Sequence, residues 1–510
     1  MKLFTNEDIR AIERQTLSAE AITIHTLVQR AAAGIADEIA QRWRTSKRIV
    51  VFAGPGGNGA DALAASALLI DRGYNPEIHL FNIGGNALND ACRRCRDNMR
   101  NNYPDADFHE VTASFNPPML SETDLVIDGL FGSGLREPLS GGFLMLVRYI
   151  NENNPTVVSI DVPSGMFGDW NHQVSPRNVI HAHLTLAIQF PRISFFMPES
   201  AELLGTWKTI DIGLSRQAID KCKSNFHLVE EHEIHNLLRP RPLFCSKADF
   251  GSALIVAGRY GMGGAAVLAA TGAIRAGAGK VTLYSPQCLY PVAQTAIPEA
   301  MFEADDDKLM ISQVRVDHPY TAYAIGPGLG TSEVTVNAVE TFIKQTKSPI
   351  VIDADALNCI ARRPAILNSL PILSVITPHA GEFDRLFGEQ TSHEARILKA
   401  IEMSRYYNIL ILLKGHYSAL IRPDGKVYFN SSGTPALATP GSGDVLTGVI
   451  TAFLAQGYKP EVSAIIAPFV HGMAGRLAEK THGQFGVAAS DVALNIGTAI
   501  MNIMQPNNSL

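Results

Sequence analysis

Short apolar runs alternate with amphipathic stretches along most of the chain. In the first part, strands are predicted where β-branched and aromatic residues follow one another and a turn residue ends the run. These runs occupy residues 48–54, 76–83, 124–132, 156–165 and 182–190. Helices are predicted at 6–15, 26–43 and 61–73. Apolar strands at this spacing are typical of a mostly parallel sheet that is covered by helices on both faces.

The alternation weakens after residue 215 and then starts again. Residues 216–244 are charged, contain a Pro-Arg-Pro sequence and show no clear strand-helix alternation. A second series follows from residue 251, and its later strands are predicted at 321–328, 349–357, 373–381 and 408–415. We therefore predict two α/β domains, residues 1–220 and 221–510.

The composition narrows the class of protein. The chain has 510 residues, of which 46% are hydrophobic and 18% charged, as expected for a soluble protein of more than one domain. A net charge of −6 argues against a nucleic-acid partner. No apolar run approaches the roughly 20 residues that cross a bilayer, and the N-terminus lacks an apolar signal core. We therefore expect a cytoplasmic protein with no membrane partner.

The six cysteines are scattered. Cys92 and Cys95 form a "CRRC" sequence, but the second pair that a zinc site would need is absent. We interpret them as reduced, structural thiols.

Three loops of the first domain bring polar residues to strand ends. "AGPGGNGADA" follows the first strand, and its backbone amides at a helix start favour an anion such as phosphate. Strand ends of a parallel sheet share one edge, so Asn58, Asp128 and Ser164 are predicted to meet there. Their oxygen ligands suit an alkali or alkaline-earth cation and not zinc or copper. Taken singly, each acid, Asp61 and Asp161 included, could instead cap a helix or form a turn.

The second domain contains a longer loop of this kind. "GTPALATPGSGDVLTG", residues 433–448, places Gly, Ser, Thr and Pro and then Asp444 before an apolar helix. The amides of Gly441, Ser442 and Gly443 can stabilise charge on a phosphoryl group in transfer. Asp444 can accept the proton of the attacking hydroxyl. The loop therefore predicts phosphoryl transfer to a hydroxyl group.

Polar residues also stand at the other strand ends of this domain. Asp353 and Asp355 follow one strand, His379 and Glu382 a second, and Lys414 a third. Each has an ordinary structural explanation: His379 could cap a helix, Lys414 could be a surface lysine and Asp353 a turn acid. Their combination with the Gly-rich loop favours an active site at this edge of the sheet.

The sequences of these loops resemble those of one enzyme family, and the resemblance extends over nearly the whole chain. "AGPGGNGADA", "DGLFGSGL" and "IDVPSG" resemble the epimerase domain of the NAD(P)H-hydrate repair enzymes. "GPGLG", "VIDADALN", "TPHAGE", "LLKG" and the 433–448 loop resemble their dehydratase domain, a branch of the ribokinase-like superfamily. The resemblance follows the order of the bifunctional bacterial form. It implies an N-terminal Rossmann-like α/β/α sandwich and a C-terminal ribokinase-like α/β domain.

For the first domain the resemblance implies a potassium ion held by Asn58, Asp128 and Ser164, with Asp161 as a catalytic residue. It also implies which residues contact the hydrated dinucleotide: Gly57, Asn58, Gly59, Ala60, Asp61, Gly132, Ser133, Gly134, Leu135, Arg136, Glu137, Pro138 and Asp161.

This sequence departs from the family pattern at four positions of the first domain. Gly57 stands where the family has Asn, and Ala60 and Ala62 stand where it has Gly. Each methyl limits how closely the backbone and a ligand can approach. Arg192 stands where Lys is frequent, and because Arg stays protonated it can stabilise charge but not shuttle a proton.

For the second domain the resemblance implies Ala253, Gly328, His379 and Asp444 around the hydrated nicotinamide. Asp444 is then the base for the hydroxyl that water addition put on the ring. The residues implied to bind ADP or ATP, with Mg²⁺, are Lys414, Gly415, His416, Tyr417, Ser418 and Gly443.

We thus expect a homo-oligomeric enzyme that interconverts the R and S forms of hydrated NADH or NADPH. It would dehydrate the S form with ADP or ATP, the bacterial family preferring ADP, and release AMP or ADP and phosphate. One alternative is a ribokinase-like kinase of a vitamin or sugar whose first domain binds nucleotides. Another is a nucleotide-sensing scaffold without activity, against which the intact "GSGD" sequence argues. A kinase would leave a stable phosphoester, whereas the dehydratase releases free phosphate and NAD(P)H.

Overall fold

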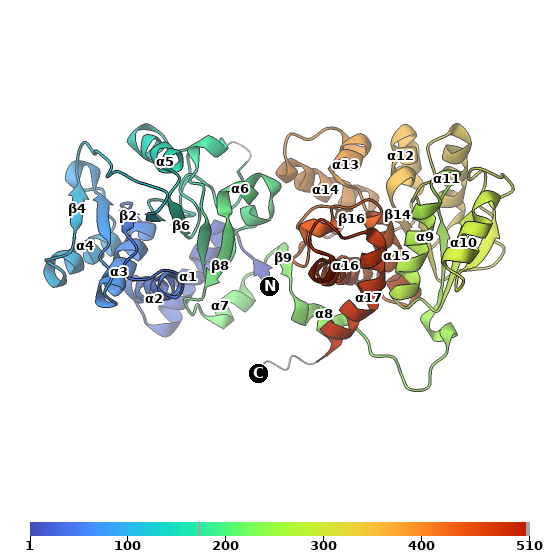
Figure 1. Ribbon diagram of the computed structural model, residues 1–510, viewed down its shortest axis with the longest axis horizontal. Helices are drawn as coiled ribbons and strands as arrows, with labels where there is room; N and C mark the ends of the chain where they lie inside the picture. Colours follow the sequence, from blue (N-terminus) through green and yellow to red (C-terminus); the bar gives the residue numbers. More distant parts are fainter. Residues whose placement is uncertain (172–173, 506–510) are drawn as a thin grey trace. The chain divides into compact units, whose positions relative to one another are not determined.

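The computed structural model describes residues 1–171 and 174–505, and the chain divides into two compact units. The N-terminal unit is Leu3–Ser224, and the C-terminal unit is Asn225–Leu510 together with Met1–Lys2 (Figure 1). Helices cover a mostly parallel sheet in each unit, so the predicted α/β class is confirmed. No helix in the described ranges combines the length and the apolar character that crossing a lipid bilayer requires.

The N-terminal unit is built on a seven-stranded parallel sheet in the order β4-β3-β2-β5-β6-β7-β8. The strands are β2 (Ile49–Ala53), β3 (Glu77–Phe81), β4 (Phe108–Val111), β5 (Leu125–Gly129), β6 (Thr156–Ile160), β7 (Leu184–Ile188) and β8 (Thr206–Ile210). After β2 the chain builds β3 and β4 on one side, and it then continues from β5 on the other. The carboxyl ends of β2 and β5 therefore flank a crevice of the kind where open α/β sheets bind ligands.

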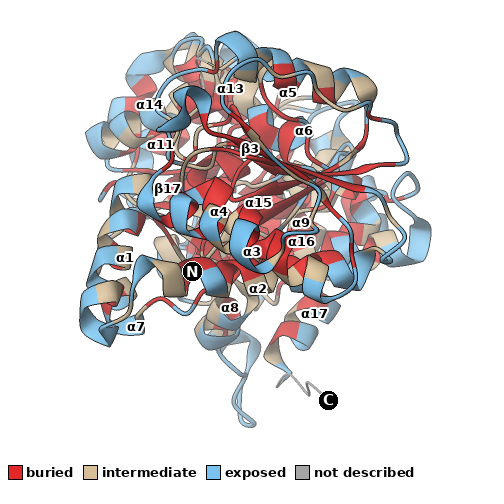
Figure 2. Ribbon diagram, turned by 90° about the vertical axis from the view of Figure 1, so that its left-hand side faces the viewer, coloured by how far each residue is buried: buried red, intermediate tan, exposed pale blue. Residues whose placement is uncertain are grey.

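Helices cover both faces of this sheet because successive strand residues point to opposite sides. Ile49, Val51 and Ala53 of β2 belong to one core, and Val50 and Phe52 belong to the other. The helices are α1 (Asn6–Glu20), α2 (Ile24–Arg42), α3 (Gly57–Asp71), α4 (Asp90–Asn102), α5 (Gly141–Asn153), α6 (Ala201–Leu204) and α7 (Arg216–Lys221). Helices α1 to α4 and α7 pack on the first core and α5 on the second, and buried residues concentrate on the strands and inner helix faces (Figure 2).

Helix α3 begins at Gly57, four residues before the start predicted at residue 61. The glycines are the reason, because an added Cβ at Gly59 would lie 1.8 Å from the carbonyl oxygen of Gly54. Only a residue without a side chain lets the helix start this close to the strand. The first helical turn, with its unpaired amides, therefore lies directly at the carboxyl end of β2.

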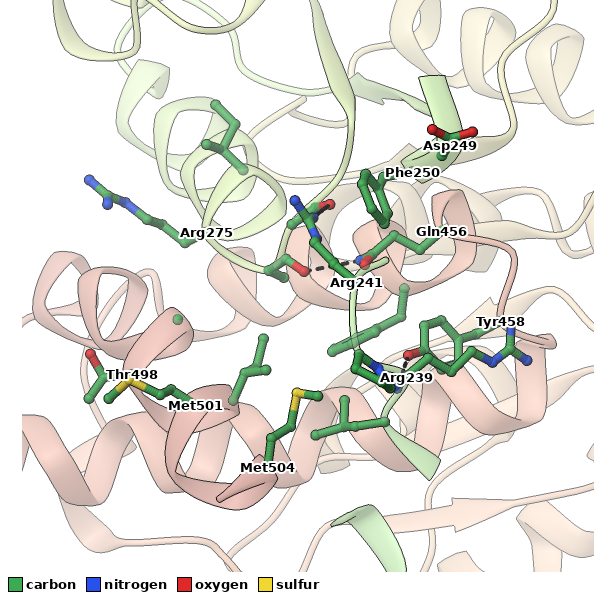
Figure 3. Close-up of a pocket in the computed structure, with 18 of the residues that line it drawn as sticks. Arg239, Arg241, Asp249, Phe250, Arg275, Gln456, Tyr458, Thr498, Met501 and Met504 are labelled. Carbon is green, nitrogen blue, oxygen red and sulfur yellow. Dashed lines mark hydrogen bonds between the residues drawn. The ribbon is translucent and has the colours of Figure 1, made fainter. Parts of the chain in front are cut away.

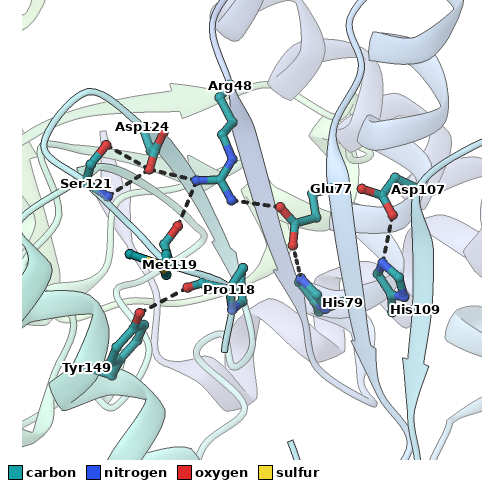
Figure 4. A network of polar contacts seen from close by, with 10 residues as sticks. All are labelled: Arg48, Glu77, His79, Asp107, His109, Pro118, Met119, Ser121, Asp124 and Tyr149. Atoms are coloured by element: carbon teal, nitrogen blue, oxygen red, sulfur yellow. Dashed lines mark hydrogen bonds and ion pairs between the residues drawn. The ribbon is translucent and has the colours of Figure 1, made fainter. Parts of the chain in front are cut away.

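The amino edge of the same sheet is tied together by charged groups (Figure 4). The Arg48 guanidinium lies 2.9 Å from Glu77 at the start of β3 and 2.9 Å from Asp124 just before β5. Glu77 also bonds the His79 ring at 3.0 Å. This network joins three strands at the end away from the crevice. We therefore assign it a role in stabilising the sheet and not in ligand binding.

The C-terminal unit contains an eleven-stranded sheet in the order β1-β9-β18-β17-β16-β15-β14-β13-β10-β11-β12. The strands are β1 (Lys2–Leu3), β9 (Phe226–Val229), β10 (Ser252–Val256), β11 (Lys280–Ser285), β12 (Met301–Ala304), β13 (Ala322–Ile325), β14 (Ile350–Ile352), β15 (Val375–Ile376), β16 (Leu410–Leu413), β17 (Ala419–Ile421) and β18 (Val427–Asn430). Strand β17 is antiparallel to β16 and β18, whereas the strands from β16 to β12 are parallel.

Helices again cover the two faces (Figure 1). They are α8 (Glu231–Leu237), α9 (Gly263–Arg275), α10 (Tyr290–Ala296), α11 (Glu333–Gln345), α12 (Ala354–Arg362), α13 (Ala380–Phe387), α14 (His393–Tyr407), α15 (Ser442–Ala455), α16 (Pro460–His482) and α17 (Ala489–Met504). The sequence of residues 216–244 shows no clear strand-helix alternation, but the structure contains α7, β9 and α8 in this stretch. These elements are short and polar, so their apolar periodicity is weak.

Helix α15 is buried nearly throughout and packs unusually closely on α9. An added Cβ at Gly448 would lie 1.9 Å from the carbonyl oxygen of Ala269, and one at Gly272 would lie 2.5 Å from that of Val445. Glycine on each helix therefore lets the two backbones touch. This contact fixes the position of the first turn of α15, which carries Asp444.

We predict that Gly448→Ala lowers the free energy of unfolding by about 1–3 kcal/mol or more, because the added methyl pushes α9 and α15 apart. Urea unfolding followed by circular dichroism measures the change. Gly264→Ala, in the same unit, is the control: its added Cβ meets nothing within 4 Å. The control should keep or slightly raise stability. Equal unfolding of Gly448→Ala and the wild type would contradict the tight helix contact.

Candidate functional site

A cavity of about 630 Å³ opens at the switch point of the N-terminal unit. Segments after β2 and β5 line it, as does helix α1. The predicted residues that line it are Gly57, Asn58, Asp61, Gly132, Ser133, Gly134, Leu135, Arg136, Glu137 and Asp161. Pro138 is exposed beside Glu137, and Gly59 packs against Gly54.

The alanine departures point away from this cavity. Ala60 and Ala62 are both completely buried in the core that α3 forms with the sheet. An added Cβ at Gly129 would lie 2.4 Å from the Ala62 Cβ, so this methyl fills space between helix and strand. The expected steric limit on ligand approach therefore does not arise from these two side chains. At Gly57 a Cβ would meet nothing within 4 Å, so the missing side chain leaves that rim open.

Asp161 is held as an anion. Its Oδ1 accepts a hydrogen bond from Nε of Arg192 at 3.1 Å and a second from the Nη2 group, and its Oδ2 accepts the Ser133 amide at 2.8 Å. Burial alone would raise the pKa of Asp161, but Arg192 and Ser133 outweigh it and lower the pKa below its ordinary value. Asp161 also has a left-handed φ of 67°, a strained conformation that is frequent at functional sites.

Asp128 lies in a different environment. It is fully buried and accepts hydrogen bonds from the Ser159 hydroxyl at 2.8 Å and from the Ser164 amide and hydroxyl at 2.8 and 2.5 Å. These donors are neutral, and it forms no ion pair in the described part of the chain. Burial therefore raises its pKa. Nearby, both amide atoms of Asn58 are buried without a hydrogen-bond partner among the described residues.

The two cysteines of the "CRRC" sequence are buried in α4. Burial raises the pKa of Cys92 to about 12 and that of Cys95 to about 11. The Cys92 Sγ donates to the carbonyl oxygen of Gly54 at 3.5 Å. Such thiols pack in the core and are poor nucleophiles.

The C-terminal unit has a cavity of about 730 Å³ at the carboxyl end of its strands. The segment after β16 lines one side and the 433–443 loop another. The predicted residues that line it are His379, Lys414, Gly415, His416, Ser418 and Gly443. Tyr417 packs edge-to-face on the His416 ring at 4.6 Å.

Ala253 and Gly328, like Asp444, are not among the residues that line this cavity. Ala253 is completely buried inside β10, so its methyl belongs to the core and not to the cavity lining. Gly328 has a left-handed φ of 65°, and an added Cβ would lie 3.0 Å from the carbonyl oxygen of Met262. Its role in the structure is a close approach between two loops.

A buried ion pair connects three elements of this site. The Lys414 ammonium lies 2.8 Å from Asp353 Oδ1, and the Thr447 hydroxyl of α15 donates to Asp353 Oδ2 at 2.8 Å. Lys414 is also 3.6 Å from Glu382. Burial alone would lower the pKa of Lys414, but the two carboxylates outweigh it and raise the pKa. The surface-lysine explanation is therefore wrong, because Lys414 is a fixed charge of the site.

Asp444 stands in the first turn of α15, beside this ion pair. Burial raises its pKa to about 7, with a further contribution from Asp353, while Lys414 opposes the shift. Gly443 leaves room here, since a Cβ would lie 3.5 Å from the Lys414 Nζ. A carboxylate with this pKa is suited to accept a proton near neutral pH.

Two histidines that line this cavity bond backbone groups near it. His379 caps α13, its Nδ1 accepting the amides of Gly381 and Glu382 at 3.0 and 3.2 Å, so the capping explanation holds although His379 also lines the cavity. His471 was not predicted from the sequence. It contacts the 433–448 loop, where its Nε2 donates to the Ser442 carbonyl at 3.0 Å. Burial lowers the pKa of His471 to about 4, so it is neutral at physiological pH.

A further cavity, of about 840 Å³, lies at the amino ends of the strands in the same unit (Figure 3). Arg239 stacks over Tyr458 at 4.6 Å and Arg241 over Phe250 at 3.8 Å. Arg241 also donates to the Gly277 carbonyl just after α9. Arg241 thus satisfies the end of α9, as basic residues commonly do, and Arg239 packs on an aromatic ring. We therefore assign a structural role to the residues of this cavity.

Comparison with known proteins also divides the chain into two parts. Residues 253–497 match the family model of NAD(P)H-hydrate dehydratase, and residues 24–194 match that of the YjeF-related protein N-terminus. The ADP/ATP-dependent NAD(P)H-hydrate dehydratase from Bacillus subtilis, co-crystallised with ATP/Mg²⁺, is 29% identical and covers 54% of this chain and 98% of its own, with a TM-score of 0.49.

Full-length relatives match both units at once. The bifunctional NAD(P)H-hydrate repair enzyme Nnr of Dictyoglomus turgidum is 29% identical over 100% of both chains. That of Moorella thermoacetica is 30% identical over 96% of this chain and 95% of its own. Because the likeness runs through both units in the same order, the chain belongs to the family of bifunctional NAD(P)H-hydrate repair enzymes.

Proposed function

We propose that this protein repairs hydrated NADH and NADPH. The N-terminal unit interconverts the R and S epimers, and the C-terminal unit dehydrates the S epimer at the expense of ADP or ATP. The environment of Asp444 is the observation that supports the dehydratase activity. A carboxyl with a pKa of about 7 stands in the first turn of a helix, beside the Lys414 charge and the glycines of an anion-binding loop.

In the dehydration, the nucleotide occupies the cavity beside Lys414, and the amides of Gly441 to Gly443 stabilise the phosphoryl group in transfer. Asp444 takes the proton of the ring hydroxyl as its oxygen bonds the terminal phosphorus of the nucleotide, and the bond from that phosphorus to the bridging oxygen breaks, so that AMP or ADP leaves. Phosphate is a good leaving group, so the C–O bond then breaks, the neighbouring ring carbon loses a proton to water, and the double bond returns. Mg²⁺, held mainly by the nucleotide's phosphates because Asp353 and Glu382 are engaged with Lys414, would neutralise phosphate charge.

For the epimerase site we propose a potassium ion bound by Asn58, Asp128 and Ser164. Two features of these residues support it: Asp128 is a buried carboxylate without a counter-ion in the described ranges, and the Asn58 amide lacks a partner there. The oxygen ligands are those that hard cations prefer. The ion would compensate the buried charge and order the loops that bind the dinucleotide.

The alternative kinase activity differs in its product. A coupled assay with purified protein, hydrated NADH and ADP or ATP, followed by NADH absorbance and phosphate release, separates the two. NADH and free phosphate in equal amounts support the proposal, whereas a stable phosphoester would support the kinase. Cytoplasmic location and a homo-oligomeric state also belong to the proposal, and size-exclusion chromatography with light scattering tests the latter.

We predict that Asp444→Asn lowers the rate of S-epimer dehydration by about 10²–10⁴, because the proton acceptor is lost. In the wild type the base works deprotonated, so the rate should fall as pH drops through about 7. Initial rates between acidic and alkaline pH measure both effects. The control is Asp424→Asn, on the exposed turn between β17 and β18. Near-wild-type NADH recovery by Asp444→Asn would rule out this base.

We predict that epimerisation requires potassium and that Asn58→Ala raises the potassium concentration needed. R-epimer conversion measured over a potassium titration tests this, and zinc should not replace the ion. Asn102→Ala, on the exposed end of α4, is the matched control. S-epimer dehydration should be the same in all three proteins. Epimerisation that is indifferent to potassium would remove the ion from the proposal.

We predict that residues 1–224 and 225–510 fold separately, since each unit has its own core. The second fragment alone should dehydrate the S epimer and stall on the R epimer, and the first fragment should relieve the stall. Activity assays on the separate and mixed fragments measure this. A folded second fragment that stays inert until the first is added would mean that the units share one site.

A further inference from the structure

Two partly buried carboxyl groups in the N-terminal cavity are not used by the contacts described so far; Glu137, which also lines the cavity, is exposed. Glu13 comes from α1 and Asp61 from α3, four residues after its start at Gly57, and both are half-buried residues that line the cavity. Neither side chain forms a hydrogen bond or an ion pair in the part of the chain that the structure describes. Both line the same cavity, and the charge of Glu13 contributes to the rise in the pKa of Asp61.

Two other charged groups that line the cavity, Asp161 and Arg192, are buried and paired with each other. Asp161 is fixed as an anion by Arg192 and the Ser133 amide. Arg192 stays protonated at any physiological pH, so it can attract charge but cannot transfer a proton. Its Nη1 group is buried without a partner among the described residues and is free to bind a ligand oxygen. Proton transfer in this cavity therefore needs another residue.

The surroundings of the pair favour a retained proton. Burial raises the pKa of Glu13, and Asp161 adds to the effect, whereas Arg192 opposes it, as do Arg10 and Arg14 on the same helix. Burial, together with the charges of Asp161 and Glu13, raises the pKa of Asp61 well above its ordinary value. Two carboxyl groups that repel each other tend to hold one proton between them.

We propose that Glu13 and Asp61 form the proton-transfer pair of the epimerase site, one serving as acid and the other as base. The proposal rests on the proposed epimerase function and adds Glu13, a residue of α1, to the catalytic groups. It assigns Arg192 and Asp161 to binding and charge stabilisation.

The chemistry of the substrate explains why a pair is useful. Water adds to an enamine double bond so that the hydroxyl ends on the carbon bonded to nitrogen. The acid of the pair protonates this hydroxyl, the C–O bond breaks, and the ring nitrogen lone pair forms a C=N bond as water leaves. Water then adds to the opposite face, the C–O bond forms again, one proton returns to the pair, and the electron pair returns to nitrogen. Protons and electrons balance without any oxidant or reductant.

The test compares variants of the full chain with the R epimer as substrate. Glu13→Gln should lower kcat for epimerisation by about 10²–10⁴ with little change in KM, because a proton donor or acceptor is lost. Glu13→Asp should recover part of the rate. Glu20→Gln, an exposed acid on the same helix, is the control and should behave as wild type. S-epimer dehydration should be unchanged throughout. Because that activity reports only on the C-terminal unit, circular dichroism and thermal unfolding show whether the N-terminal unit of each variant is folded.

Further readouts distinguish catalysis from simple positioning. In ¹⁸O-labelled water the wild type should exchange the ring hydroxyl at the rate of epimerisation, and Glu13→Gln should lose both together. The bell-shaped pH dependence of kcat expected for an acid–base pair should lose one limb in Glu13→Gln. Glu13→Gln combined with Asp61→Asn should cost little more than either change alone.

Three results would overturn the proposal: an unchanged kcat in Glu13→Gln, a change in KM alone, or epimerisation without oxygen exchange. A wild type that recovers NADH only from the S epimer would overturn the epimerase function itself, and this proposal with it.

Discussion

Burying carboxylate groups at the carboxyl edge of a parallel sheet is the constraint on which both units depend. An ionised carboxylate that leaves water without a partner is strongly disfavoured, so it must be paired, hydrogen-bonded or protonated. Each unit pairs one acid with a fixed cation, Asp161 with Arg192 and Asp353 with Lys414. Other acids nearby are left without such a cation, and their pKa values rise.

Glycine makes this arrangement possible by bringing helix starts close to strand ends. Helix α3 can begin beside β2 because Gly59 has no side chain to strike Gly54, and α15 can lie against α9 because Gly448 touches Ala269. The result in each unit is a helix that starts close to a strand end and carries an acid near that start: Asp61 of α3 lines its cavity, and Asp444 of α15 stands beside Asp353 and Lys414. The position of the acid thus follows from backbone packing, and its pKa follows from the position.

Much of this was predictable from the sequence, but only where the signal is local. Continuous apolar strands and the Gly-rich loops were found, and the acids at strand ends met as parallel topology requires. The short strands β9, β17 and β18 were missed because three or four residues carry little periodicity, and β9 joins its sheet through a partner about 200 residues away in sequence. Glu13 was missed because nothing local connects a helix at the N-terminus with loops after β2 and β5. The start of α3 was predicted late because glycines usually indicate a turn and here begin a helix.

In each unit the ion pair also acts on the pKa of a nearby acid that has no cation of its own. In the C-terminal unit burial is the main cause that raises the pKa of Asp444; the Asp353 carboxylate adds to the shift and Lys414 opposes it. In the N-terminal unit burial is likewise the main cause that raises the pKa of Glu13, while Arg192 opposes the shift and Asp161 adds to it. A fixed pair whose two charges act in opposite directions tunes its neighbour without itself changing protonation. Removing only the cation would therefore raise the pKa of the neighbouring acid, and removing only the paired carboxylate would lower it.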